Sequence, residues 1–344
     1  MDSPKTKVKV WVVENGKVRP RSDYLATEEP LEIRLVAAGI RRTIAITMRT
    51  PGNDFELVAG FLYSEGAINK REDIRRITHC VDNGTGKMPI PQTQSFSGGV
   101  GETGKMPIPQ TQSFSGGVGE TGKMPIPQTQ SFSGGVGVSP AQSIKAKFAD
   151  NIVNVELAAD ELPDLATLER HFYTTSACGV CGKTSLEALR RRGFPPIQTQ
   201  IKVSPELIYS LPEKLRSAQG IFTITGGLHA AALFNSDGEL LAVREDVGRH
   251  NALDKLIGWA LLSSQLPLNN HIVMVSGRSS FEIMQKCLAA GVPIVCAVSA
   301  PSSLAVSLAQ EFGITLIGFL RGERFNVYAG VERIGGAIDR PPGV

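Results

Sequence analysis

Alternating and β-branched apolar positions indicate that the first part of the chain, up to about residue 160, is rich in strands. The pattern predicts strands over Val8–Val13, Leu31–Val36 and Arg42–Met48, because a period of two suits a half-buried strand. One helix interrupts them, with Asn53 as its expected N-cap and Gly66 as its end. The apolar side of this helix is predicted to consist of Phe55, Leu57, Val58, Phe61 and Leu62.

From about residue 198 the pattern changes to short, apolar strands that alternate with helices. The predicted strands are Ile221–Thr225, Leu240–Arg244, His271–Val275, Ile294–Val298 and Ile314–Phe319. The predicted helices are Arg249–Leu262, Ser280–Ala290 and Ser302–Glu311. Strands that are apolar on both faces are typical of a parallel or mixed sheet covered by helices. We therefore expect an α/β fold in this part of the chain.

A tandem repeat stands between the two parts. The string TGKMPIPQTQSFSGGVGE begins at Thr85, restarts at Thr103 and Thr121, and stops after Gly137. Each copy offers only four larger apolar side chains, worth about 6–12 kcal/mol when buried, against a backbone ordering cost of roughly 18–36 kcal/mol. We expect residues 85–137 to be a disordered insertion. The alternative is a proline-type docking motif presented three times.

The flanks of the repeat support the insertion. Asp73–Cys80 and Asn151–Leu157 both have strand patterns, so they could form a hairpin whose turn the repeat has lengthened. The entropy of closing a loop grows only logarithmically with its length, so such an insertion costs little.

Composition and charge narrow the class of protein. The 344 residues have a net charge of +3, too mild to argue for nucleic acid, and five cysteines are too few for a disulfide framework. Met1–Val13 lacks the apolar run of a secretory signal. The uncharged stretch Cys287–Gln310 contains two prolines and is predicted to be strand, turn and helix rather than a membrane span. We expect a cytoplasmic protein that binds neither nucleic acid nor membranes.

A pair of cysteines is the first candidate for chemistry. Cys178 and Cys181 are separated by two residues and directly precede Lys183–Arg191, a segment with a helical pattern. Free backbone N–H groups at a helix start, the helix dipole and a nearby lysine all lower the pKa of a thiol. The flanking glycines leave the pair sterically open, so a nucleophilic or sulfur-carrying pair is the favoured interpretation.

Three other interpretations of this pair are weaker. A structural zinc site would need further ligands, whereas Cys80, Cys287 and Cys296 are scattered and His171 or His229 could join only if the fold brought it close. A zinc deaminase needs His-x-Glu and Pro-Cys-x-x-Cys, and neither is present. A thioredoxin-like dithiol needs a preceding βαβ unit, but the segment before Cys178 is polar and helical in pattern. Two exposed thiols without a role remain the simplest alternative.

Three predicted strand-to-helix loops share a composition suited to an anion. They span residues 245–250, 275–280 and 298–303, where small residues let backbone N–H groups approach a phosphate. Asp246, Arg249, His250 and Arg278 lie in these loops. The alternative is that Ser279, Ser302 and Asp246 are ordinary helix caps. None of these three loops carries a Walker A motif or a G-x-G-x-x-G string, so a nucleotide-driven motor or a dinucleotide dehydrogenase is not supported.

Two further places carry candidate residues. His229 follows Thr-Gly-Gly-Leu and is either a ligand contact or a hydrogen-bonded core histidine. The segment Phe319, Leu320, Arg321, Gly322, Glu323 and Arg324 follows the last predicted core strand. It places two guanidinium groups around a glycine turn, which suits phosphate recognition or, alternatively, a solvated surface.

Several long strings, in order, resemble one known family. They are Gly60–Gly66, Cys-Gly-Val-Cys-Gly at 178–182, Thr-Gly-Gly-Leu-His-Ala-Ala at 225–231, Glu-Asp-Val-Gly-Arg-His-Asn-Ala-Leu-Asp-Lys-Leu at 245–256 and Ser-Gly-Arg-Ser-Ser at 276–280. Together they are similar to the formate dehydrogenase accessory sulfurtransferases, or FdhD-type family, over roughly residues 30–80 and 150–330. The triple repeat has no counterpart in the family pattern.

The resemblance implies a cytoplasmic sulfur carrier with a cytidine-deaminase-like α/β sandwich that lacks the deaminase zinc ligands. In such proteins a cysteine desulfurase loads sulfur onto the cysteine loop, here onto Cys178 with Cys181 as its partner. The sulfur then passes to the molybdenum cofactor, a bis-molybdopterin guanine dinucleotide, before that cofactor enters formate dehydrogenase. By position, Phe319–Arg324 corresponds to a cofactor-binding stretch. A resident metal is not expected, and a homodimer is compatible with this interpretation.

The combined prediction divides the chain into four parts. Residues 1–160 form a smaller strand-rich part, 161–197 the cysteine loop with flanking helices, 198–330 an α/β cofactor-binding domain and 331–344 a tail. Arg278, His229, Asp246 and His250 are additional candidate cofactor contacts. The rival function is a zinc- or nucleotide-binding regulator without group transfer.

Overall fold

The computed structural model describes residues 3–80, 151–163 and 182–335. A first strand pair consists of β1 (Lys5–Glu14) and β2 (Lys17–Ala26), which run antiparallel. The next sheet has the order β4-β3-β6-β5, formed by β3 (Glu29–Ala37), β4 (Ile40–Arg49), β5 (Ile74–His79) and β6 (Ile152–Leu157). Strands β5 and β6 pair antiparallel, which confirms the hairpin pairing predicted for the flanks of the repeat. The repeat itself lies outside the described residues.

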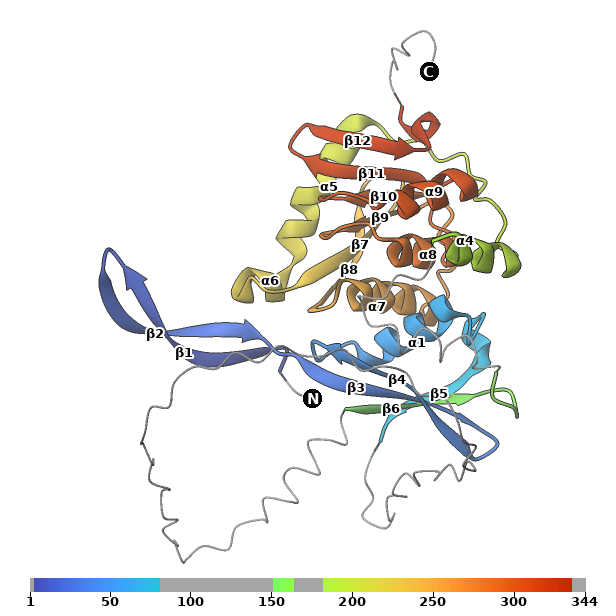
Figure 1. Ribbon diagram of the computed structural model, residues 1–344, viewed down its shortest axis with the longest axis horizontal. Coiled ribbons are helices and arrows are strands. Elements are labelled where there is room, and N and C mark those ends of the chain that lie inside the picture. Colours follow the sequence, from blue (N-terminus) through green and yellow to red (C-terminus); the bar gives the residue numbers. More distant parts are fainter. Residues whose placement is uncertain (1–2, 81–150, 164–181, 336–344) are drawn as a thin grey trace, which may run out of the picture. The chain divides into compact units, whose positions relative to one another are not determined.

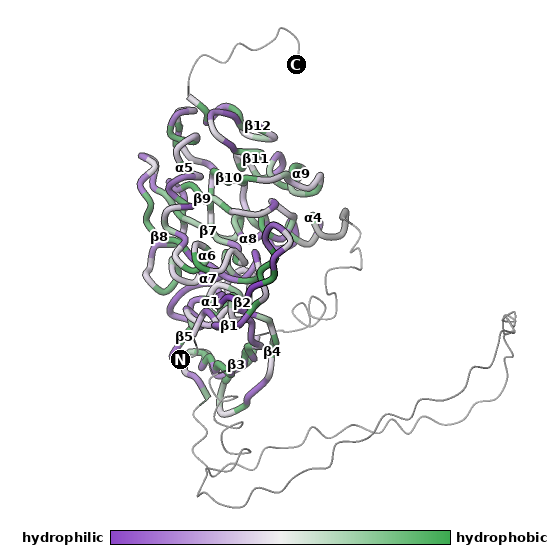
Figure 2. Tube along the Cα trace, turned by 90° about the vertical axis from the view of Figure 1, so that its left-hand side faces the viewer, coloured by the Kyte–Doolittle hydropathy of each residue, from purple (hydrophilic) through white to green (hydrophobic). Residues whose placement is uncertain are grey.

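A six-stranded mixed sheet forms the second part, in the order β12-β11-β10-β9-β7-β8. Its strands are β7 (His229–Phe234), β8 (Leu240–Asp246), β9 (Ile272–Val275), β10 (Ile294–Ala297), β11 (Thr315–Arg321) and β12 (Arg324–Ala329). Strands β9, β10 and β11 are parallel and β7 is antiparallel to β9. The tube along β9 and β10 is apolar in Figure 2, as expected for strands buried on both faces.

Helices cover both faces of this sheet (Figure 1). One apolar cluster joins the sheet to α7 (Arg249–Leu262), α8 (Phe281–Ala289) and α9 (Ser303–Phe312). The other joins it to α5 (Pro205–Ala218), through Ile208, Leu211 and Leu215. Helix α1 (Asp54–Glu65) covers the four-stranded sheet and packs on α7. The predicted α/β class is confirmed, whereas the finer cytidine-deaminase-like arrangement stays a prediction.

Most predicted elements are present, but one is wrong. Residues 221–225, expected to be a strand, belong to helix α6 (Gly220–Thr225). The Glu245 carboxylate accepts hydrogen bonds from the N–H groups of Ile221 (3.0 Å) and Phe222 (2.8 Å). The hydroxyls of Thr223 and Thr225 donate to backbone carbonyls four residues earlier. These contacts outweigh the strand preference of the β-branched residues.

Other details refine the predicted helices. Asn53 occupies the N-cap position of α1, but its side chain makes no capping hydrogen bond, and Phe55 is exposed on that helix. The stretch Cys287–Gln310 contains the end of α8, strand β10 and most of α9, as predicted. In the part of the chain that the structure describes, no helix is long and apolar enough to cross a membrane.

Candidate functional site

One edge of the six-stranded sheet gathers most of the predicted site residues. The carboxyl ends of β8, β9, β10 and β11 lie at this edge, together with the first residue of β7, because β7 is antiparallel to both β8 and β9. All three predicted strand-to-helix loops leave from it, toward α7, α8 and α9. We call it the strand-end edge and define it by His229, residues 246–250, 276–282 and 299–302, and Phe319. Ligands usually bind at such an edge in α/β proteins.

Asp246 anchors the loop between β8 and α7. Its carboxylate is completely buried and lies 2.7 Å from the Lys255 Nζ. It also accepts hydrogen bonds from the backbone N–H groups of Thr50 (3.1 Å) and Gly248 (2.9 Å) and from the Asn251 side chain (3.2 Å). Protein donors therefore occupy both oxygens, so this carboxylate holds the loop in place.

His229 and Arg249 face the loop after β9. A Cβ atom on Gly277 would lie 3.4 Å from His229 Nδ1 and 3.8 Å from Arg249 Cδ, so the glycine makes room for both side chains. Burial, and next the Arg249 charge, lower the pKa of His229, while Asp246 opposes this shift. The ring is therefore neutral at pH 7.

His250 connects the starts of α7 and α8. Its Nε2 lies 3.3 Å from the Ser280 Oγ and 3.8 Å from the Glu282 Oε2. Burial, followed by the charges of Arg249 and Lys286, lowers its pKa from 6.5 to about 4, against the opposing effect of Glu282. A neutral imidazole at this place can exchange a hydrogen bond with Ser280 without adding charge.

The loops after β9, β10 and β11 touch one another and form a continuous surface. The Ser279 carbonyl accepts a hydrogen bond from the Ser302 N–H (3.0 Å), and the Ser299 carbonyl accepts one from the Phe319 N–H (3.2 Å). Ser302 caps α9, with its hydroxyl accepting from the Ala305 N–H, as the capping alternative predicted. The N-cap of α8 is Ser280 rather than Ser279, and that of α7 is Gly248 rather than Asp246.

Unused donors remain at this edge. The buried Nε of Arg249 and the buried Oγ of Ser279 have no hydrogen-bond partner among the described residues. Arg278 is exposed, and no carboxylate in the described part of the chain pairs with it. Positive charge and free donors without an acceptor suit an anionic ligand.

The segment Phe319–Arg324 continues this surface into a hairpin. Arg321 of β11 pairs with Arg324 of β12 around the two-residue turn Gly322–Glu323. Leu320 is buried, whereas the other five residues of the segment are exposed. Phe319 has φ +53°, the left-handed region, and stands at an irregularity in the strand pairing. Two guanidinium groups therefore flank a glycine turn, as predicted.

Cys178 and Cys181 lie outside the described residues. The helix predicted after them is present as α4 (Gly182–Arg191), which begins directly after Cys181. Its end is fixed to the body, because Leu189 is buried and Arg190 pairs with Glu311 of α9 (Nη2–Oε2 2.9 Å). Arg192 then donates to the Ser64 carbonyl of α1.

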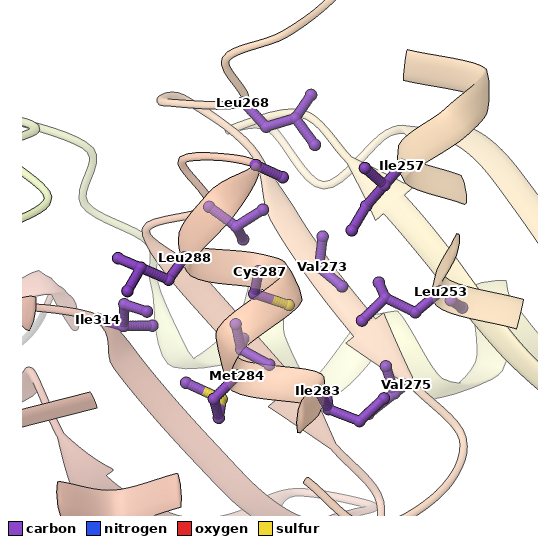
Figure 3. Packing of buried hydrophobic residues seen from close by; sticks show 14 of the residues in the cluster. Leu253, Ile257, Leu268, Val273, Val275, Ile283, Met284, Cys287, Leu288 and Ile314 are labelled. Carbon is purple, nitrogen blue, oxygen red and sulfur yellow. The ribbon is translucent and has the colours of Figure 1, made fainter. Parts of the chain in front are cut away.

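Two of the described cysteines, Cys287 and Cys296, are buried in the core and differ from a reactive thiol. Cys287 lies between α8 and the sheet among Ile283, Met284 and Val273 (Figure 3), and burial raises its pKa to about 12. Burial also raises the pKa of Cys296. Thiols held in their protonated form inside the core are unreactive. Within residues 3–80, 151–163 and 182–335, His, Cys, Asp and Glu side chains form no cluster of three that could hold a metal ion.

Lys255, Thr50, Ser280 and Glu282 complete the site but were not singled out from the sequence. Thr50 contacts Asp246 across 196 positions of the chain, so no local pattern marks it. Lys255 lies close to Asp246 in the chain, inside the string at 245–256, but only the folded structure shows that the two side chains pair. Ser280 and Glu282 carry a weak local signal, because they occupy the N-cap and first turn of a predicted helix beside a loop rich in small residues.

Comparison with known proteins assigns the family. The model of the FdhD/NarQ family matches residues 26–106 and 133–335, so its match is interrupted inside the repeat. The chain is 44% identical over 329 residues to the sulfur carrier protein FdhD of Streptomyces coelicolor, covering 95% of this chain and 94% of that protein. It is 40% identical over 328 residues to the sulfur carrier protein FdhD of Sulfurisphaera tokodaii, covering 95% and 98%.

A solved structure shares the fold. The crystal structure of a protein from Desulfotalea psychrophila, described as a formate dehydrogenase accessory protein, superposes with a TM-score of 0.60 and 24% identity, covering 96% of this chain and 100% of that one. The family match, the near full-length relatives and the order of the motifs agree. The chain is therefore a member of the FdhD/NarQ family.

Proposed function

We propose that this protein is a cytoplasmic sulfur carrier that accepts sulfur from a cysteine desulfurase and delivers it to the molybdenum cofactor of formate dehydrogenase. The observation that supports it best is the positive strand-end edge, with Arg249 and Arg278 beside backbone loops suited to phosphate. A bis-molybdopterin guanine dinucleotide carries two diphosphate groups, which are the kind of anion that these loops suit. The names of the relatives agree with sulfur carriage.

The residues around the edge have distinct proposed roles. Arg249, Arg278, Arg321 and Arg324 contact phosphate, because they are the cations that this surface presents. His229 and His250 contact the ligand as neutral rings, so they donate or accept hydrogen bonds without adding charge. Asp246 acts indirectly, by holding the start of α7 through Lys255 and Thr50. Phe319 is exposed beside the hairpin, where its ring can cover the substrate.

The chemistry proposed for Cys178 and Cys181 has two balanced steps. The Cys178 thiolate attacks the outer sulfur of the desulfurase persulfide, so an S–S bond forms on Cys178 and the desulfurase thiolate leaves. Cys181 then attacks the inner sulfur of this Cys178 persulfide. A Cys178–Cys181 disulfide forms, and one sulfide with two protons is released to the molybdenum of the substrate. The two electrons come from the thiol pair, and a cellular thiol reduces the disulfide afterwards.

Mass spectrometry after incubation with a cysteine desulfurase and cysteine tests this function. We expect one added sulfur on wild type and on a Cys80→Ala control, and none on Cys178→Ala. An undiminished adduct on Cys178→Ala contradicts the assignment. Stoichiometric zinc whose removal unfolds the protein would instead favour a zinc-binding regulator.

A further inference from the structure

The strand pair β1–β2 separates its side chains into two chemically different faces. Residues directly opposite each other in an antiparallel pair share a face. One face carries Lys5, Lys7, Lys9, Trp11 and Val13, opposite Ala26, Tyr24, Ser22, Pro20 and Val18 respectively. We call it the Lys–Trp face. The other face carries the alternate residues, which include both carboxylates of the pair, Glu14 and Asp23.

The far end of the Lys–Trp face is apolar and open. Trp11 is 72% exposed, Val13 68% and Val18 62%, and the valines stand opposite each other next to the Trp11–Pro20 pair. A monomeric protein rarely exposes a tryptophan together with neighbouring aliphatic side chains unless they form a contact surface. Tryptophan also ranks among the residues that contribute most to protein interfaces.

The near end of the same face is positive. Lys5, Lys7 and Lys9 stand in a row, and no acidic residue of β1 or β2 shares their face. On the opposite face Arg19 pairs with Glu14. Between Lys5 and Ala26 there are six Lys or Arg residues against two carboxylates, so this short segment has a larger positive excess than the +3 of the whole chain.

The base of the strand pair is tied to the body. Two hydrogen bonds hold the strands to each other at this base, from the Thr27 N–H to the Pro4 carbonyl (3.0 Å) and between the Thr6 and Thr27 hydroxyls (2.8 Å). Helix α6 packs against β2, where Ala26 approaches Gly227. A two-stranded pair without a covering layer is marginally stable. The base therefore fixes the direction of the pair, and a partner on the exposed face would stabilise its far end.

We propose that the Lys–Trp face docks onto a protein partner whose surface has an apolar pocket bordered by carboxylates. Trp11 fills the pocket, Val13, Val18 and Pro20 surround it, and the three lysines meet the acidic border. Face-to-face packing of two copies is disfavoured, because the Lys–Trp face carries no carboxylate that could pair with the lysines of the other copy. A single-stranded nucleic acid fits less well, because the two valines offer no stacking surface and Lys5 already lies over the Tyr24 ring.

The experiment measures binding of the full chain to two purified proteins from the same organism, its cysteine desulfurase and its formate dehydrogenase. This choice of partners rests on the proposed function. We expect Trp11→Ala to weaken binding to one of them by about 10-fold or more, and Lys9→Glu by about 5-fold or more. The matched controls on the opposite face, Val10→Ala and Arg21→Glu, should stay within about 2-fold of wild type.

Several outcomes would overturn the docking face. The first is that Lys9→Glu and Arg21→Glu weaken binding equally. The second is that Trp11→Ala mainly abolishes self-association or binding of single-stranded DNA. The third is that the wild-type protein binds neither the desulfurase nor the formate dehydrogenase. Unchanged melting temperatures show that the variants remain folded. Loading of Cys178 with sulfur, measured separately, reports on the proposed function. If Cys178 is loaded normally with sulfur but variants on the two faces bind equally well, the docking face is contradicted while the proposed function is not.

Discussion

Gly60 of α1 lies directly against Gly258 of α7, where the two helices cross. A Cβ atom on either glycine would lie 2.7 Å from the backbone nitrogen of the other, and still closer to a backbone carbonyl of the opposing helix. No side chain can be accommodated there without separating the helices. This contact joins the four-stranded sheet layer, through α1, to the helix that begins at the strand-end edge.

Gly258→Ala should destabilise the protein strongly, because the obstructing atoms are backbone and cannot rotate away. We expect a loss of about 1–3 kcal/mol or more in the free energy of unfolding, as is typical of overpacked interiors. Urea unfolding measures it. Gly220→Ala is the matched control, since nothing lies within 4 Å of a Cβ there and its φ is not positive. Equal stability of the two variants would contradict the close helix crossing.

Arg321 and Arg324 should contribute to binding of a guanine nucleotide. The double variant Arg321→Ala/Arg324→Ala loses two exposed guanidinium groups, each able to make a charge-assisted hydrogen bond to phosphate. We expect guanosine diphosphate to bind about 10-fold or more weakly, measured by calorimetry. Arg75→Ala on β5 is the control, because that side chain pairs with Glu156 instead. Equal affinity for adenosine diphosphate in wild type would argue against guanine-specific recognition.

His250 should make stability depend on pH. Its folded-state pKa of about 4 lies below the ordinary 6.5, so the unfolded state binds more protons between these values. Its contribution to stability is therefore complete above pH 6.5 and is lost as the pH falls through 4. Burial and the charges of Arg249, Lys286 and His229 cause this shift, with Glu282 opposing it.

Thermal melting from pH 7 to pH 4 checks this expectation. His250→Asn removes the titrating ring, so its melting temperature should fall less over this range than that of wild type. An identical pH dependence in the two proteins would show that the ring is not shielded as the structure indicates.

Deletion of Thr103–Gly137 should leave folding and sulfur loading nearly unchanged. The deletion removes repeat copies, while β5 and β6, which pair with each other, keep a long connection. The family model also has no match at residues 107–132, inside the deleted stretch. Melting temperature and the sulfur adduct on Cys178 are the measurements. A large loss of either would give the repeat a role beyond that of an insertion.

The sequence predicted the helices and strands whose apolar pattern and caps agree with their tertiary surroundings. Helix α7 has the predicted bounds Arg249–Leu262, because its apolar side faces the sheet and the loop before it is rich in small residues. Helix α6 was predicted as a strand, since its capping carboxylate, Glu245, is distant in the chain. Strand β2 was not predicted, because Pro20 and its many charges hide the pairing with β1.

Site residues that belong to a short local motif could be predicted from the sequence. Contacts between residues that are far apart in the chain could not. The loops at residues 245–250 and 275–280 were recognised by composition, and the structure brings them together at one edge. The contact of Asp246 with Thr50 crosses 196 positions of the chain, so only the folded structure could show it. The same holds for His250 and Glu282, which come from different helices.

The buried pair of Asp246 and Lys255 has an electrostatic consequence for the whole edge. Because the ammonium group lies 2.7 Å from the carboxylate, the two charges form a dipole whose field falls off within a short distance. The acidic residue in the loop therefore does not cancel the attraction of the neighbouring guanidinium groups for an approaching anion. At a distance, the Asp246 carboxylate therefore adds little negative potential to the strand-end edge, although it is an acidic residue in the loop sequence.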